Sequence, residues 1–211
     1  MKVAILSESS ADEAAIRIFV EGLLARSTEP VEFKGLRSRG WPSVRNLLGA
    51  IYKDLWYRTD ADALVVVADS DEATIHHPSH AEPATGPRPC RLCELQQVER
   101  RVRGDLRPVA GRGPLRIAIG IATPAIEAWY AVGLDPHVNE PTWVQALASR
   151  QFPYTKASLK ELVYGTERPS LQLETERATE AARRLTSSLN EVIERFPMGF
   201  GPLAQEIRSW R

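Results

Sequence analysis

Short apolar runs alternate with longer amphipathic stretches along the first two thirds of the chain. Four of the runs have the length and composition of β-strands: residues 2–7, 31–35, 61–68 and 114–122. The run ADALVVVA at 61–68 is apolar at nearly every position, which is typical of a strand that helices cover on both faces. We therefore expect this third run to be a buried strand.

Apolar residues at helical spacing predict helices between the strands. Ser9 or Ser10 can cap the first helix, and Asp12 and Glu13 fall in its first turn, where the helix dipole favours acids. The same spacing predicts helices over residues 42–58, 92–106 and 123–132. Strands that alternate with helices predict an α/β fold, with a parallel sheet of about four strands and helices on both faces.

The last third of the chain carries no convincing strand signal. Within residues 174–196, five apolar residues recur at helical spacing: Leu185, Leu189, Val192, Ile193 and Phe196. We therefore expect an α/β core over residues 1–135, with an insertion at 72–93, and a helical extension over 136–211 that packs on the core. A length of 211 residues accommodates one domain with such an extension.

The composition is that of an ordinary soluble globular protein, with 43% hydrophobic and 26% charged residues. No apolar run approaches the roughly 20 residues of a membrane span. The apolar run near the N-terminus is too short for a signal peptide. These features predict a cytoplasmic protein without a membrane partner.

The formal net charge is zero, so the chain as a whole has no electrostatic attraction for nucleic acid. Between Arg88 and Arg116, however, eight arginines stand against three acids. This strip is either the solvated face of a helix or a surface that contacts phosphates. We favour the first interpretation, because arginine outnumbers lysine throughout the chain.

Acidic residues follow three of the four predicted strands. Glu8 follows the first strand, Asp69 and Asp71 follow the third, and Glu127 lies one helical turn beyond the fourth. Sites in open parallel sheets form beyond the carboxyl ends of the strands, so these carboxylates are expected to converge. Either Asp alone could simply cap a helix, but a Glu and a D-x-D after two strands form a more specific pattern.

Carboxylates that lie a few ångströms apart repel one another unless a cation compensates their charge. A ligand set of oxygens, without His or Cys, predicts Mg²⁺ or Mn²⁺. Metal ions held in this way activate water and stabilise the oxygens of a transferring phosphoryl group. We therefore expect Glu8, Asp69, Asp71 and Glu127 to form a site for Mg²⁺ or Mn²⁺.

The Glu after the first strand and the D-x-D after the third resemble the TOPRIM domain of topoisomerases, primases and OLD-type nucleases. The segment TPAIEAWYAVG (123–133) is similar to the N-P-hydrophobic-E-hydrophobic-W segment of compact RloB-like and OLD-type TOPRIM proteins. FPYTKASLKELVYG (152–165) resembles the Tyr-x-Lys segment that lies downstream in these proteins. The resemblance spans roughly residues 1–165.

The resemblance implies a TOPRIM-like, Rossmann-like fold and a metal-dependent nuclease or phosphoryl-transfer enzyme that acts on DNA or RNA. It also implies a setting in bacterial antiviral defence, beside an ATPase partner. The family's catalytic, Mg²⁺-binding acids match Glu8, Asp69, Asp71 and Glu127, and Glu8 would also act as general acid or base. Lys156 matches the family's Lys, which would stabilise charge on the phosphoryl group.

Two positions depart from the family pattern. Ser9 stands where the family has Gly, and the family's second acid corresponds to either Asp12 or Glu13. Lys156 and Lys160 lie one helical turn apart, and the Tyr-x-Lys resemblance favours Lys156. A catalytic Lys156 has to lie within about a side-chain length of the acids, on the order of 6–10 Å or less; otherwise it is a solvated surface lysine.

The insertion holds three of the four histidines and both cysteines of the chain: His76, His77, His80, Cys90 and Cys93. Four such side chains can bind a structural Zn²⁺ tetrahedrally. In that case we expect Cys90, Cys93 and His80 as the first ligands, with His76 or His77 as the fourth. The alternatives are a buried, reduced thiol pair with surface histidines, or a redox C-x-x-C, which normally opens a helix directly after a strand.

Other enzyme classes lack their motifs in this chain. A G-x-x-x-x-G-K-[ST] phosphate loop is missing, which argues against a P-loop ATPase, and no G-x-S-x-G elbow is present. Two further functions stay open. One is a non-catalytic TOPRIM-like regulatory or docking module, which should expose a large apolar patch. The other is a Rossmann-like nucleotide binder that does not hydrolyse its ligand.

Overall fold

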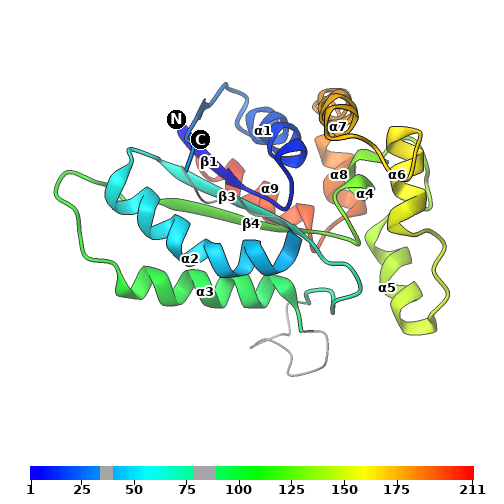
Figure 1. Cartoon of the computed structure of the whole chain (residues 1–211), viewed down its shortest axis with the longest axis horizontal. Coiled ribbons are helices and arrows are strands. Elements are labelled where there is room, and N and C mark those ends of the chain that lie inside the picture. The colour runs from blue at the N-terminus through cyan, green and yellow to red at the C-terminus, as the bar shows by residue number, and fades with distance from the viewer. Residues whose placement is uncertain (34–39, 78–88) are drawn as a thin grey trace.

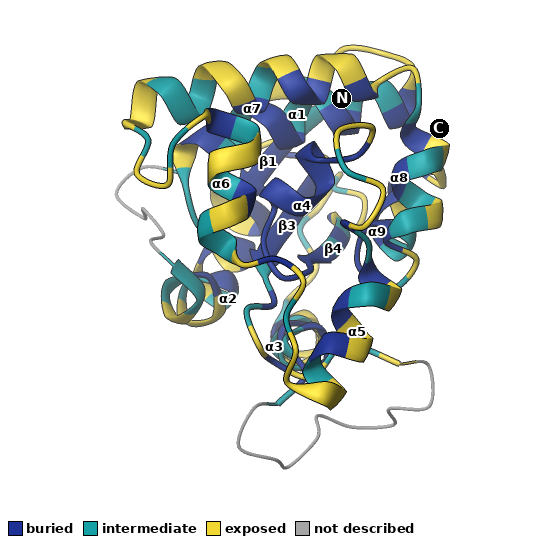
Figure 2. Ribbon diagram, turned by 90° about the vertical axis from the view of Figure 1, so that its right-hand side faces the viewer, coloured by how far each residue is buried: buried dark blue, intermediate teal, exposed yellow. Residues whose placement is uncertain are grey.

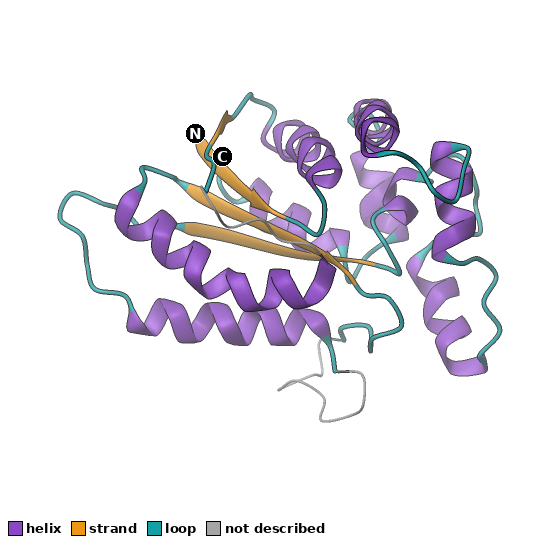
Figure 3. Cartoon of the chain, in the orientation of Figure 1, coloured by secondary structure: helices purple, strands orange, loops and turns teal. Residues whose placement is uncertain are grey.

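Four parallel strands form one sheet in the computed structural model, which describes residues 1–33, 40–77 and 89–211 (Figure 1; Figure 3). Their order is β2-β1-β3-β4, and each neighbouring pair is parallel. The bounds of the strands are β1 Lys2–Leu6, β2 Glu29–Pro30, β3 Ala63–Asp69 and β4 Arg116–Ala122. β3 lies between β1 and β4 and pairs with β4 along its whole length.

Helices cover both faces of the sheet (Figure 1). α2 and α3 lie on one face, α1 and α9 lie on the other with α7 against α1, and α4 to α6 lie beyond the carboxyl ends of the strands. The bounds of the helices are α1 Ser10–Leu24, α2 Gly40–Arg58, α3 Arg91–Asp105, α4 Glu127–Tyr130, α5 Glu140–Ser149, α6 Lys156–Tyr164, α7 Leu171–Leu185, α8 Leu189–Arg195 and α9 Phe200–Arg208. This Rossmann-like arrangement confirms the α/β class, the parallel sheet and the flanking helices. Within the described ranges, no helix has the length and apolar character to cross a membrane.

Side chains of the strands alternate between the two faces of the sheet, as extended backbone requires. In β3, Val65 and Val67 belong to the core under α1 and α9, whereas Leu64 and Val66 belong to the core under α2 and α3. The buried residues accordingly follow the sheet and the inner sides of the helices (Figure 2). Burial on both faces explains why the run at 61–68 is apolar throughout.

The start of α1 follows the capping signal in the sequence. Ser9 has extended backbone angles, and its side chain accepts a hydrogen bond from the Ala11 amide (3.2 Å). Ser9, rather than Ser10, is therefore the cap. This short connection places Glu8 directly between the end of β1 and the first turn of α1.

The second strand is shorter than expected and lies earlier in the chain. Glu29 and Pro30 pair with β1, and the Val31 amide donates to the Val3 carbonyl (3.1 Å). Val31 and Phe33 lie partly buried against the core under α2 and α3, so their apolar character reflects packing rather than strand pairing. The strand expected at 31–35 is thus wrong in position, and residues 34 and 35 lie outside the described part.

The helix expected at 123–132 is also shorter, because α4 covers only Glu127–Tyr130. Its expected first turn makes other contacts. The Pro124 carbonyl accepts from the Asp71 amide (2.9 Å), and the Ile126 amide donates to Asp69 Oδ1 (3.0 Å). The backbone after β4 is therefore shaped to hold the end of β3 instead of starting a helix.

The apolar stripe at 174–196 spans two helices rather than one. α7 ends at Leu185 and α8 begins at Leu189. Between them, the hydroxyls of Thr186 and Ser187 donate to carbonyls one turn earlier (2.6 and 3.3 Å), a local bonding pattern that competes with helix continuation. The stripe nevertheless faces the core, since Leu185, Leu189, Val192 and Phe196 are buried and Ile193 is partly buried.

The close approach of the chain before α9 to β4 predicts a specific effect on stability. A Cβ at Gly199 would lie 2.1 Å from the Ile121 backbone oxygen, whereas a Cβ at Gly104 in α3 would meet nothing within 4 Å. We expect Gly199→Ala to lower the free energy of unfolding by about 2 kcal/mol or more, because the backbone must shift. Gly104→Ala, the matched control, should leave it unchanged or raise it by up to about 1 kcal/mol. Urea unfolding measures both, and equal losses would contradict the close packing.

Candidate functional site

The carboxyl ends of β1 and β3 bring two of the expected acids into contact. Glu8 follows β1, and Asp69 is the last residue of β3. Glu8 Oε1 accepts a hydrogen bond from the Asp69 amide (3.0 Å), although 61 positions separate them in sequence. Adjacent parallel strands end at the same edge, which is why sequence reasoning could place these residues together.

The D-x-D loop, residues 69–71, is fastened to the chain that follows β4. The Ser70 amide donates to the Ala122 carbonyl (2.7 Å), and the Asp71 amide donates to the Pro124 carbonyl (2.9 Å). Asp71 has a left-handed backbone (φ 49°), which Asp tolerates better than most residues. These bonds fix the direction in which the Asp71 side chain leaves the loop.

Lys156 joins the two carboxylates of the D-x-D loop. It is the first residue of α6, whose N-terminus is capped by Thr155 in a capping box with Ser158. Its Nζ lies 2.7 Å from Asp69 Oδ2 and also forms an ion pair with Asp71. The distance is well inside the range required of a catalytic lysine, so Lys156 is not a solvated surface lysine.

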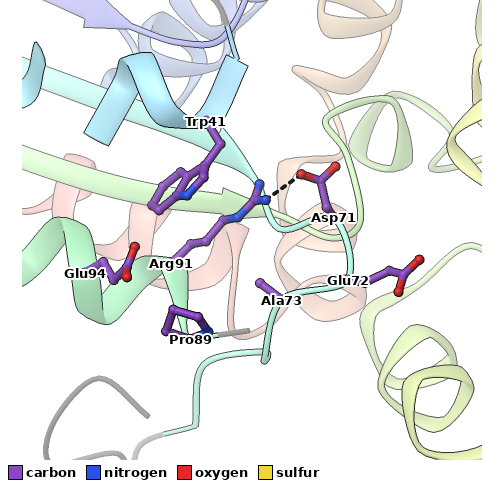
Figure 4. Close-up of a pocket in the computed structure, with 7 residues that line it drawn as sticks. All are labelled: Trp41, Asp71, Glu72, Ala73, Pro89, Arg91 and Glu94. Atoms are coloured by element: carbon purple, nitrogen blue, oxygen red, sulfur yellow. Dashed lines mark ion pairs between the residues drawn. The ribbon is translucent and has the colours of Figure 1, made fainter. Parts of the chain in front are cut away.

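Arg91 is a second cation at the D-x-D loop, and sequence reasoning did not single it out. Its Nη1 donates to the Asp69 carbonyl (2.6 Å), and its Nη2 lies 2.6 Å from Asp71 Oδ2. The guanidinium also lies over the ring of Trp41, 4.8 Å from the ring centre (Figure 4). In sequence, Arg91 is one of eight arginines in a basic strip, and nothing local distinguishes it.

A second set of acids lies beside the first. Glu127 is buried, with Lys160 Nζ 3.8 Å from its Oε1, and Lys160 also lies 3.3 Å from Glu174. Asp12 faces this set from α1: burial raises its pKa well above the usual value, and the charges of Asp69, Glu127, Glu174 and Glu8 add to the shift. Asp12 is thus the α1 acid that shares the edge with the D-x-D loop.

Glu13, the alternative to Asp12, has a different electrostatic setting. Burial raises the pKa of Glu13, and the charged groups that act on it most are Arg17, which lowers the pKa, and Glu32, which raises it. The structure therefore distinguishes two acids that the sequence left equivalent. The two side chains point in different directions from α1, and which of them faces the acidic edge depends on how that helix packs.

Burial and mutual repulsion divide the acids into two protonation classes. Burial raises the pKa of Glu8 to about 7, with the charge of Asp69 adding to the effect. Burial likewise raises the pKa of Glu127 to about 7. For Asp71, burial acts upward, but the contacts with Lys156 and Arg91 outweigh it and lower the pKa. Glu8 and Glu127 can therefore each take up or release a proton near neutral pH, whereas Asp71 stays ionised.

Negative charge exceeds positive charge at this edge, which we call the acidic site. Its six carboxyl groups are Glu8, Asp12, Asp69, Asp71, Glu127 and Glu174. Among the residues that the structure describes, three cations contact them: Lys156, Lys160 and Arg91. Six acids against three cations leave an excess of three negative charges if all groups are ionised. In addition, the hydroxyl of Tyr130 is buried without a hydrogen-bond partner in the described chain, and Asp12 is the charge that acts on it most.

The expected convergence of four carboxylates on one metal ion is not found. Among the described residues, a single group of three or more His, Cys, Asp or Glu has all its ligand atoms within 4.8 Å of one another, and it is not part of the acidic site. The reason is that the Lys156 ammonium lies between Asp69 and Asp71 and compensates their charge. Glu127 pairs with Lys160 instead of joining the D-x-D loop.

The group that can hold a metal ion consists of His76, Cys90 and Cys93. His76 Nδ1 lies 3.4 Å from Cys93 Sγ and 3.7 Å from Cys90 Sγ, and both cysteines are buried. Burial, together with the neighbouring Cys90, raises the pKa of the Cys93 thiol to about 11. The Cys93 thiol is therefore protonated at neutral pH unless a cation stabilises its thiolate.

His76, one of the two candidates for the fourth ligand, is the described histidine of this group. His80 was expected among the first three ligands, but it lies outside the described residues. His76 lies with the cysteines, whereas the adjacent His77 is exposed and is not part of the group. Neighbouring residues in extended chain point in opposite directions, so a sequence repeat of two histidines cannot show which one turns inward.

Comparisons of the chain with protein-family models, with curated proteins and with solved structures give no match. The observations on the site therefore rest on the residues and geometry of this chain alone.

The buried carboxyls predict how stability depends on pH. Glu127 holds its proton up to about pH 7 when folded but only to about 4.5 when unfolded, so stability falls as the pH rises through this window. Glu127→Gln should remove this loss and be more stable than wild type at pH 8, by on the order of 1–3 kcal/mol, with no such gain at pH 4. Urea unfolding at both pH values measures the difference. The control is Glu180→Gln on the exposed side of α7, and an equal gain there would contradict the assignment.

Proposed function

We propose that the chain is a TOPRIM-like enzyme that uses Mg²⁺ or Mn²⁺ to cleave, or transfer phosphoryl groups of, nucleic acid. The observation that carries the proposal is the position of Lys156 between Asp69 and Asp71 at the carboxyl edge of a parallel sheet, beside Glu8. Four of the five residues that the TOPRIM resemblance singles out are thus neighbours in space: Glu8, Asp69, Asp71 and Lys156. Glu127, the fifth, pairs with Lys160 in the set of acids beside them. A parallel-strand edge is also where α/β proteins hold their ligands.

The chemistry of the donors fits a hard divalent cation. The acidic site offers carboxylate oxygens without sulfur or imidazole, and it carries more acids than cations. Asp69, Asp71 and Glu8 would hold the ion, which would stabilise the charge on the oxygens of a phosphodiester. Lys156 is the counter-ion of Asp69 and Asp71.

The residues of the chain can carry out the remaining parts of phosphoryl transfer. Lys156 bears its charge on a flexible side chain that is 39% exposed, and it can neutralise charge on a phosphoryl oxygen. Asp69 and Asp71 raise the pKa of Lys156 against the opposing effect of burial, so it stays positive at neutral pH. Glu8, with a pKa of about 7, can accept and return a proton.

The energetics of the site favour an enzyme over a docking module. A docking module needs exposed apolar surface. Five large apolar side chains are well exposed in the described chain, and no two of them belong to the same helix: Tyr57, Leu134, Val144, Leu162 and Leu171. A docking module has no use for buried acids in excess of their counter-ions, which cost stability. Such perturbed groups are instead typical of sites that bind ions or transfer protons.

Metal-dependent cleavage tests the proposal. We expect plasmid DNA, single-stranded DNA or RNA to be cleaved in Mg²⁺ or Mn²⁺ and not in EDTA. Asp69→Asn and Lys156→Met should each reduce the rate by about 100-fold or more, because each removes a charge that contacts the phosphate or its metal ion. Glu180→Gln should cleave as wild type does. If wild type cleaves none of the three substrates with either metal, the proposal fails; if Asp69→Asn is as active as wild type, the activity belongs elsewhere.

We further propose that the ion held by His76, Cys90 and Cys93 is a structural Zn²⁺. Two thiolates and an imidazole are ligands that zinc prefers over Mg²⁺ or Mn²⁺. The three ligand atoms are already close together, so binding requires little rearrangement. Binding would also release the proton that the buried Cys93 thiol otherwise keeps.

Elemental analysis tests the zinc proposal. Purified protein should contain about one zinc per chain, and Cys93→Ser should lose it, because one thiolate ligand is missing. His77→Ala is the matched control: it removes an imidazole next to His76 but should keep the metal. Protein that has no zinc even after incubation with Zn²⁺, with both thiols open to thiol reagents, would contradict the site.

A further inference from the structure

The two cysteines of the metal-holding group stand on either side of Arg91. Cys90 immediately precedes α3, Arg91 is its first residue, and Cys93 lies in the same helical turn. The thiols contact His76, while the guanidinium contacts Asp69 and Asp71. One turn of helix therefore belongs to both the cysteine group and the acidic site.

The residues that contact the first turn of α3 also belong to one segment of the chain. The chain leaves β3 at Asp69, passes through Asp71 and reaches His76 five residues later. Two links join this segment to the start of α3: Arg91 binds the D-x-D loop at one end, and His76 meets the two thiols at the other. Each link limits the movement that would break the other one.

Arg91 is held in a position that leaves it little freedom. Its side chain is 14% exposed, both terminal nitrogens are bonded, and Trp41 covers the guanidinium (Figure 4). The first turn of α3 has no side-chain cap, because Cys90 makes no capping hydrogen bond. The start of the helix, and with it the backbone of Arg91, therefore depends on what binds the cysteines.

The side chains of the cysteine group make only weak contacts with one another. A thiol and an imidazole at 3.4 and 3.7 Å form at most weak hydrogen bonds. A bound metal ion replaces them with three ligand bonds that fix the His76 segment to the first turn of α3. Partners of this kind, one step removed from a site, commonly change its activity or metal affinity by about 10–100-fold.

We propose that the metal ion held by His76, Cys90 and Cys93 positions Arg91 on the D-x-D loop, so that occupancy of the cysteine group controls the order of the acidic site. Arg91 is a positioning residue in this scheme: it acts on Asp69 and Asp71 and not on a substrate. The predicted effect on catalysis rests on the proposed phosphoryl-transfer function. The predicted effect on the order of the loop does not.

Hydrogen–deuterium exchange of the full chain tests the link directly. Removal of zinc from wild type with a chelator should speed exchange at residues 69–73 by about tenfold or more, and added Zn²⁺ should restore protection, since Ser70 and Asp71 amides are hydrogen-bonded in the ordered loop. In Arg91→Gln, exchange at 69–73 should already be fast and zinc removal should add nothing. Arg91→Lys should behave like Arg91→Gln, because a lysine cannot make the two-pronged contact. His77→Ala should respond as wild type does.

The outcomes separate this inference from the proposed function. If zinc removal speeds exchange only around residues 90–93, or has the same effect at 69–73 in Arg91→Gln as in wild type, the link through Arg91 is overturned. A chain that binds no zinc overturns it as well. Where cleavage is present, zinc removal should slow it by about tenfold, and the loss should not add to that of Arg91→Gln. Absence of cleavage in the zinc-loaded protein refutes the proposed function alone, because exchange still decides the link.

Discussion

The ion pairs of Lys156 with Asp69 and Asp71 are the contact on which the arrangement of the molecule depends. They join α6 to the end of the central strand across 87 positions of sequence and place a cation where two carboxylates would otherwise repel each other. Without that charge, a partly buried aspartate at the end of β3 would be costly to ionise. The helices that follow β4 are thus tied to the strand edge by electrostatics as well as by apolar packing.

The same edge also shapes the backbone around it. Residues 122–126 give two carbonyls and one amide to the end of β3, and this is why α4 starts at Glu127. Asp71 accepts a left-handed backbone in the same loop, held from one side by Lys156 and from the other by Arg91. The loop is therefore ordered by contacts from three separate parts of the chain: the start of α3, the residues after β4 and the start of α6.

The described cations do not compensate all the negative charge of the acidic site. Glu8 and Glu127 have pKa values raised to about 7, and Asp12 is raised further, because burial and repulsion exceed what the cations supply. The fold tolerates this because the sheet and its two cores bury continuous apolar surface on both faces. The group of His76, Cys90 and Cys93, which can hold a metal ion, includes residues at the start of α3, where Arg91 contacts the D-x-D loop. Oxygen ligands and sulfur ligands therefore meet at α3.

Local patterns in the sequence determined the parts of the protein that depend on neighbouring residues. Periodicity predicts β1, β3 and β4, the residue types before the first helix predict a cap at Ser9 or Ser10, and parallel strand ends place Glu8 beside Asp69. The short β2 and the late start of α4 were decided by tertiary contacts that override local propensity, whereas the split of the 174–196 stripe coincides with local hydrogen bonds of Thr186 and Ser187. Only the tertiary structure could select Arg91 from eight arginines, His76 from adjacent histidines and Asp12 over Glu13. These choices depend on the direction in which a side chain leaves its element, and that direction is set by packing between distant segments.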